Sequence, residues 1–182
     1  MKFFSDNVVF MDTEFSSLNP YRGEILSVGL VKLNGEELYL ELEYDGEVDE
    51  WVEENILPTL KKPKVTREEA RQKIKEFIGK DKPFMISYVN QFDAIYWYKL
   101  FGVDNNPCYW IPIDFASILF SLGIDPTSYY HGDKNNFFEK IGVDYSNYTQ
   151  HYALDDAKLL REVYLKFLKL TQRDLDKLRQ ER

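Results

Sequence analysis

Apolar and polar positions divide the first quarter of the chain into three predicted strands. The first, over residues 8–15, begins with four apolar residues and then carries acids at alternate positions. A second strand is predicted over residues 25–33, and a third over residues 37–44, where leucines recur at every second position. Asn34 and Gly35 lie between them and predict a two-residue hairpin turn that needs a positive φ. The three strands should therefore form an antiparallel meander.

Beyond the meander, helical and strand patterns alternate. Thr66 and Glu69 have the spacing of a capping box, and the helix that they begin should end at Gly79. Residues 45–55 are acidic and show no sharp periodicity. The remaining predicted elements are a strand over 83–88, a helix over 92–101, a strand over 109–113, a helix over 114–122, a short helix over 135–141, and a long helix from near Leu154 towards the C-terminus. This order predicts an α/β fold with a mixed sheet flanked by helices.

Two acids at the end of the first strand are the first candidate functional residues. Asp12 and Glu14 are two positions apart, so on an extended strand their side chains point to the same face. Two like charges on a buried strand are costly, and a cation that coordinates both carboxylates removes that cost. Oxygen-rich sites of this kind suit Mg²⁺ or Mn²⁺.

Two later segments carry groups that could complete such a site. Asp93 opens the helix after the fourth strand, and His151 and Asp156 stand at the start of the last helix. If the segments converge, four carboxylates meet with an imidazole at the edge of their site. Two-metal phosphodiester hydrolysis needs this set, because carboxylates hold two divalent ions while a base takes the proton of the attacking water. Histidine suits the role of base because its pKa lies near working pH.

These residues resemble the motifs of a known family. Asp12-x-Glu14, an aromatic residue before Asp93, and His151-x-Ala153-x-x-Asp156 are similar to the three motifs of the DEDDh 3′ to 5′ exonucleases, which have a ribonuclease H-like fold. The small size most resembles the stand-alone exoribonuclease branch that includes oligoribonuclease and ribonuclease T.

The resemblance implies specific roles and a substrate. It implies that the four acids bind two divalent metal ions, Mg²⁺ or Mn²⁺, and that His151 is the general base. It implies hydrolysis at the 3′ end of a single-stranded nucleic acid, with RNA favoured over DNA. It also implies that Leu18 parts the last two bases of the substrate, with Phe15 packing nearby.

Several alternatives remain at this point. The sister DEDDy class uses a tyrosine four residues before its last acid, and Tyr152 satisfies that spacing to Asp156, although the flanking residues favour His151. An endonuclease or a DNA proofreading accessory would keep the same fold and metals. A non-catalytic nucleic-acid-binding module would keep the fold alone.

Composition narrows the function classes. The net charge of -8 argues against a broad cationic face for long nucleic acid and favours short substrates gripped at the active site. The lone Cys108 excludes an intrachain disulfide framework, and no run approaches the length of a membrane span, so we expect a cytoplasmic protein without membrane contact. We expect one exonuclease domain over residues 1–182, whose charged helical extension over 171–182 could serve a homodimer contact.

Other polar residues have simpler interpretations. We expect Asp114 to cap a helix, and Asp155 to point about 100° away from Asp156 around its helix. His131 is interpreted as a loop residue. The basic segment over residues 61–67 is interpreted as a solvated face, and it is also where a nucleic-acid backbone would most readily touch.

Overall fold

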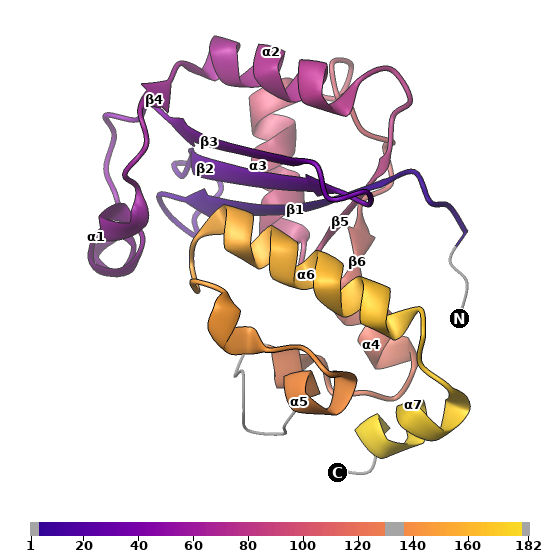
Figure 1. Ribbon diagram of the computed structural model, residues 1–182. Coiled ribbons are helices and arrows are strands. Elements are labelled where there is room, and N and C mark those ends of the chain that lie inside the picture. Colours follow the sequence, from indigo (N-terminus) through magenta and orange to yellow (C-terminus); the bar gives the residue numbers. More distant parts are fainter. Residues whose placement is uncertain (1–3, 130–136, 180–182) are drawn as a thin grey trace.

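A mixed β-sheet organises the fold, as the computed structural model of residues 4–129 and 137–179 shows (Figure 1). Within these residues six strands form one sheet in the order β4-β3-β2-β1-β5-β6. The strands are β1 Val8–Phe15, β2 Ile25–Lys32, β3 Glu37–Leu42, β4 Lys64–Val65, β5 Phe84–Ser87 and β6 Ile113–Asp114. β1, β2 and β3 are antiparallel to one another, whereas β5 runs parallel to β1. The predicted mixed sheet is confirmed, and its first strand lies between β2 and β5.

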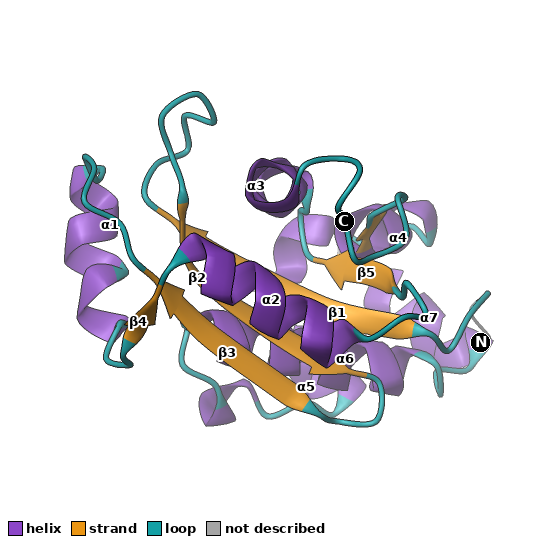
Figure 2. Ribbon diagram, turned by 90° about the horizontal axis from the view of Figure 1, so that it is seen from above, coloured by secondary structure: helices purple, strands orange, loops and turns teal. Residues whose placement is uncertain are grey.

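Helices cover both faces of this sheet. α2 and α3 lie on one face and α6 lies across the other, as the two views in Figures 1 and 2 show. α1 lies beyond the end of the sheet, next to β4. The helices are α1 Glu50–Asn55, α2 Arg67–Ile78, α3 Gln91–Phe101, α4 Phe115–Ser121, α5 Phe137–Ile141, α6 Ala153–Phe167 and α7 Gln172–Arg179.

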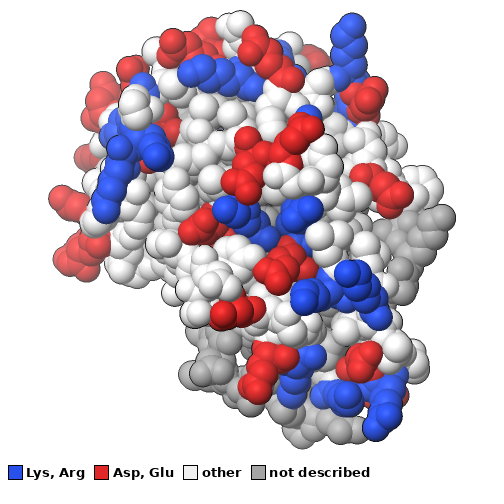
Figure 3. Space-filling model, in the orientation of Figure 1, with Lys and Arg blue, Asp and Glu red and all other residues white. Residues whose placement is uncertain are grey.

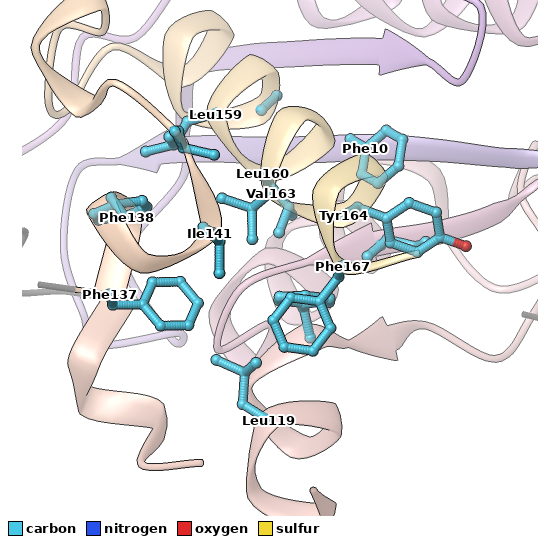
Figure 4. Close-up of a cluster of buried hydrophobic side chains, with 14 of the residues drawn as sticks. Phe10, Leu119, Phe137, Phe138, Ile141, Leu159, Leu160, Val163, Tyr164 and Phe167 are labelled. Atoms are coloured by element: carbon cyan, nitrogen blue, oxygen red, sulfur yellow. The ribbon is translucent and has the colours of Figure 1, made fainter. Parts of the chain in front are cut away.

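Each face of the sheet packs its own apolar core, because alternate residues of β1 point to opposite sides. Val9 and Met11 pack with the helices α2 and α3. Phe10 packs on the other side with α4, α5 and α6, where its ring meets that of Tyr164 at 5.0 Å (Figure 4). The same alternation directs Asp12 and Glu14 to the face that α6 covers.

Local signals place the starts of α2 and α4 where the sequence predicts them. The Thr66 side chain accepts from the Glu69 backbone N–H, and the Glu69 carboxylate accepts from that of Thr66, so the capping box of α2 is complete. Asp114 accepts hydrogen bonds from the backbone N–H groups of Ala116 and Ser117 and caps α4 as expected.

The hairpin between β2 and β3 differs from the prediction. The Lys32 N–H donates to the Glu36 carbonyl at 2.8 Å, and the Gly35 N–H donates to the Lys32 carbonyl at 2.9 Å, so three residues form the turn. Gly35 has φ 95°, and it is the only one of the three with a positive φ. The predicted two-residue turn is therefore wrong in length, because a three-residue turn needs the left-handed conformation only at its last position.

The predicted long C-terminal helix is also wrong, because it is two helices. α6 ends at Phe167, and the backbone N–H of Asp174 donates to the Thr171 hydroxyl at 3.3 Å, which starts α7 anew. Leu175 of α7 is buried in the core that α4, α5 and α6 share, and the Arg179 side chain donates to the Leu122 carbonyl. One face of the charged extension thus packs against the domain.

Three shorter elements also depart from the prediction. The segment without periodicity contains the helix α1, and the basic segment contains the strand β4. The strand predicted over 109–113 is confined to β6. No helix in the described part of the chain is both long enough and apolar enough to span a bilayer.

Candidate active site

β1 carries Asp12 and Glu14 to the centre of the sheet. Asp12 pairs with Gly29 of β2, and a side chain at Gly29 would place its Cβ 2.2 Å from the Ala153 carbonyl oxygen. Glycine therefore allows the start of α6 to approach the sheet closely. This close approach brings Asp156, in the first turns of α6, to the two acids of β1.

Three carboxylates meet at this point. One oxygen from each of Asp12, Glu14 and Asp156 lies within 4.8 Å of the other two. Burial and the neighbouring acids raise the pKa of Asp12 and of Glu14 well above their usual values. Burial likewise raises the pKa of Asp156 to about 7, although hydrogen bonds from the backbone of His151 and Tyr152 act to lower it. Such a group is costly in the ionised form unless a cation compensates it, and its oxygens suit a divalent ion.

Asp93 lies beside this group but is held differently. Its carboxylate accepts hydrogen bonds from the Thr13 backbone N–H at 3.0 Å and from the Thr13 hydroxyl at 2.6 Å. Burial raises the pKa of Asp93 to about 7, and the two bonds from Thr13 oppose that rise. Asp93 lines the same pocket as the other three acids, so the four predicted ligands surround one cavity while three of them form the tight group.

His151 also lines the pocket, from the turn that precedes α6. Its φ of 59° is left-handed, a conformation that is uncommon for residues other than glycine. Its ring packs edge to face on that of Trp51, with 5.0 Å between the ring centroids. Its carbonyl accepts a hydrogen bond from the Thr59 hydroxyl at 3.3 Å. Burial lowers the pKa of the imidazole, which favours its neutral form.

Tyr152 points elsewhere. Its ring packs against Tyr39 of β3 with 4.5 Å between the ring centroids, and it is not among the residues that line the pocket. Of the two overlapping motif residues, His151 is therefore the one that lines the pocket of the acids. The left-handed turn at His151 separates the two side chains, which no spacing rule could predict.

The two predicted substrate contacts have different positions. Phe15 lines the pocket and stacks on Tyr96 at 4.7 Å. Leu18 lies in the loop after β1 and is 61% exposed, outside the pocket lining. The Tyr96 hydroxyl donates to the Ser17 carbonyl and fixes this loop next to Leu18.

Sequence reasoning missed the aromatic wall of the pocket. Tyr88 and Tyr129 line it as a stacked pair, with 3.9 Å between their centroids, and Tyr145 lines it as well. Gln150, next to His151, is a further lining residue. The abundance of tyrosine in the sequence gave no signal that singles these out, because their positions depend on how separate loops pack.

The remaining polar residues mostly follow their simpler interpretations. Asp155 accepts from the Thr149 backbone N–H at 3.0 Å, outside the acidic group. Asn90 precedes α3 without a side-chain cap. Asp114 adds an unexpected contact, because its carboxylate also accepts from the Val89 N–H at 2.9 Å, near Asp93. His131 lies outside the described residues.

Charges of both signs are interspersed over the face that carries α6 (Figure 3). In the basic segment, Lys61, Lys62 and Lys64 are exposed, and Arg67 pairs with Glu24 at 3.1 Å.

Comparisons with known proteins give the fold. No protein-family model and no curated protein matches the chain. Among solved structures, Escherichia coli exonuclease I in complex with a dT13 oligonucleotide superposes with a TM-score of 0.63 at 16% identity, covering 93% of this chain and 42% of that one. This chain shares the ribonuclease H-like fold of the matching part of exonuclease I. The zinc-bound E. coli exonuclease I complex with single-stranded DNA gives a TM-score of 0.65 at 16% identity, covering 93% of this chain and 41% of that one.

A thermophilic relative of that enzyme is similar to the same extent. Exonuclease I from Methylocaldum szegediense gives a TM-score of 0.64 at 16% identity, covering 93% of this chain and 42% of that one. The chain thus spans less than half the length of the structures that it matches. The predicted ribonuclease H-like fold is confirmed, and at this identity the likeness concerns the fold alone.

Proposed function

We propose that this chain is a metal-dependent exonuclease that hydrolyses phosphodiester bonds from the 3′ end of single-stranded nucleic acid. The observation that carries the proposal is the group of Asp12, Glu14 and Asp156, whose carboxylate oxygens lie within 4.8 Å of one another in a pocket that also holds an imidazole. The exonuclease I fold supports the reaction class, because it is shared with structures solved on single-stranded DNA.

The residues fit divalent ions. Asp12, Glu14 and Asp156 would hold one ion, and Asp93, which lines the same pocket, would help to hold a second. Mg²⁺ and Mn²⁺ suit an all-carboxylate donor set better than softer metals do. When bound, the ions would compensate the buried negative charge, polarise the phosphodiester and lower the pKa of an attacking water.

His151 is proposed as the general base. Burial lowers the pKa of its imidazole and so favours the neutral form, in which one ring nitrogen can accept a proton from the attacking water. The edge-to-face contact with Trp51 orients the ring. Tyr152 has no such role in this proposal, because its ring packs on Tyr39.

The substrate would enter over the aromatic wall. Bases of a single strand stack on aromatic rings, and Phe15 and Tyr129 offer rings beside the acids. Leu18 is exposed at the loop tip, where an apolar side chain can wedge between unpaired bases. The motif resemblance favours RNA, while the neighbours bound to DNA favour DNA, so both sugars belong in the test.

The test is digestion of matched single-stranded RNA and DNA, each labelled at the 5′ end, with Mn²⁺ or Mg²⁺. We expect the wild type to give a ladder that shortens from the 3′ end. Asp12→Asn and His151→Ala should give no ladder, whereas Tyr152→Phe should give the same ladder as the wild type. The RNA and DNA lanes give the sugar preference directly. A ladder that survives in His151→Ala and disappears in Tyr152→Phe would assign the reaction to the tyrosine class.

A circular single strand tests the need for a free end. An exonuclease leaves an internally labelled circle intact, whereas an endonuclease linearises it. Cleavage of the circle at the rate of the linear strand would overturn the proposed exonuclease activity.

A further inference from the structure

Glu41 is a buried acid that lies outside the proposed metal site. It is 1% exposed, on strand β3. Its Cα pairs with that of Ser27 on β2, and Ser27 pairs in turn with Glu14 on β1. Residues in one such row point to the same face of a sheet, so Glu41 shares the face of the acidic group.

One oxygen of Glu41 joins two separate pieces of the chain. Oε1 accepts a hydrogen bond from the Tyr39 hydroxyl at 3.0 Å and another from the Lys61 backbone N–H at 2.9 Å. Oε2 is buried and has no hydrogen-bond partner among the described residues. Burying a carboxyl group with one oxygen unpaired costs folding free energy, so packing alone does not explain an acid at this position.

Both pieces contact the turn that carries His151. The Tyr39 ring packs against Tyr152 at 4.5 Å. The hydroxyl of Thr59, two residues before Lys61, lies 3.3 Å from the His151 carbonyl oxygen and 2.8 Å from that of Ile56, so its one proton is shared between these two acceptors. Because a left-handed residue other than glycine persists only when its surroundings hold it, these two contacts supply the support that the turn needs.

We propose that Glu41 is a positioning residue for His151. It fixes Tyr39 on one side and the segment of residues 59–61 on the other, and through them it fixes the left-handed turn that holds His151 at the pocket. The effect of Glu41 on catalysis rests on the proposed function, in which His151 is the base. The effect of Glu41 on the orientation of His151 does not depend on the proposed function.

The orientation is tested by NMR of the imidazole side chains. The sequence has two histidines, so His131 serves as an internal reference once His151→Ala has assigned the signals. Glu41→Leu removes the acceptor and should shift or broaden the His151 signal while the His131 signal stays. Glu41→Gln keeps an acceptor oxygen and should restore most of the wild-type His151 signal.

A control and a second variant separate positioning from general loosening. Leu42 follows Glu41 on β3, and its side chain lies in the core on the opposite face of the sheet. Leu42→Ala should therefore destabilise the protein and leave the His151 signal unchanged. Thr59→Val removes the direct bond to the His151 carbonyl at a partly buried site and should move the signal in the same direction as Glu41→Leu, even if the latter folds poorly. Unchanged signals in both Glu41→Leu and Thr59→Val, or an equal change in Leu42→Ala, would overturn the proposal.

Activity gives the second readout. Glu41→Leu should lower kcat about tenfold with KM changed less than twofold, since a misaligned base affects the chemical step and not substrate binding. Glu41→Gln should recover most of that loss. If Glu41→Leu and Leu42→Ala lose the same stability and the same kcat, the loss comes from general destabilisation, and Glu41 does not position His151. If the wild type cleaves no nucleic acid, the proposed function fails, and the His151 signal still decides whether Glu41 positions the turn.

Discussion

Asp156→Asn removes one of the charges that the fold buries beside Asp12 and Glu14. In the metal-free protein the Asp156 pKa lies at about 7, raised from 3.8 by burial. A carboxyl pKa that is raised on folding contributes stability that is present below the unfolded value and is lost as pH rises through the folded value. The metal-free wild type should therefore lose stability between pH 5 and pH 8, while the amide has no such charge to bury.

The magnitude follows from the pKa. Between pH 5 and a folded pKa of about 7, each pH unit lowers the stability of the wild type by about 1.4 kcal/mol, so the variant should gain about 3 kcal/mol on the wild type from pH 5 to pH 8. Comparing two pH values cancels effects of the amide that do not depend on pH. Asn also keeps an oxygen that can accept from the backbone of His151 and Tyr152.

The assay is urea unfolding with a chelator present, followed by tryptophan fluorescence at pH 5 and pH 8. Asp155→Asn is the matched control, because it removes the same formal charge one residue away, where the side chain accepts from Thr149 outside the acidic group. Added Mn²⁺ at pH 8 should stabilise the wild type and not Asp156→Asn. A stability difference between Asp156→Asn and the wild type that is the same at both pH values would refute the reasoning.

Three further predictions concern contacts around the site. Gly29→Ala should abolish most of the activity and lower the melting temperature. The added Cβ would lie 2.2 Å from the Ala153 carbonyl oxygen and force α6 away from β1. Unchanged activity would contradict this, because it would mean that α6 can shift without moving the acids. Thr13→Val should weaken Mn²⁺ binding about tenfold or more in calorimetry, since the Asp93 carboxylate loses a 2.6 Å hydrogen bond of a kind that contributes about 1.5–3 kcal/mol, whereas Thr13→Ser should bind nearly as the wild type does. Leu175→Ala should cost about 2–4 kcal/mol in urea unfolding, because this side chain anchors α7 in the core; a cost under about 0.5 kcal/mol would mean that α7 detaches freely.

Local sequence signals account for the parts of the fold that a few neighbouring residues decide. The apolar start of β1 and its alternating acids specify a buried strand with Asp12 and Glu14 on one face, and the structure has both. The capping residues Thr66 and Asp114 set the starts of α2 and α4, because a side-chain acceptor satisfies backbone N–H groups within the same turn. These features need no information from distant residues.

Elements too short to show a period could not be predicted. α1 has six residues with one of them, Val52, buried, and β4 has two residues that exist as a strand through pairing with β3. The break between α6 and α7 was missed for a related reason, since the apolar stripe continues through it while Thr171 restarts the helix. In each case a tertiary contact or a single cap outweighs periodicity.

The candidate site divides in the same way. The sequence by itself determined which acids and which histidine stand at the ends of their elements, because chain order and spacing carry that information. Tertiary structure alone decided that His151 and not Tyr152 faces the pocket, through a left-handed turn held by Thr59 and Tyr39. It also decided which tyrosines form the pocket wall. Side-chain direction at a turn depends on the backbone that neighbouring segments enforce, and only the folded chain brings those segments together.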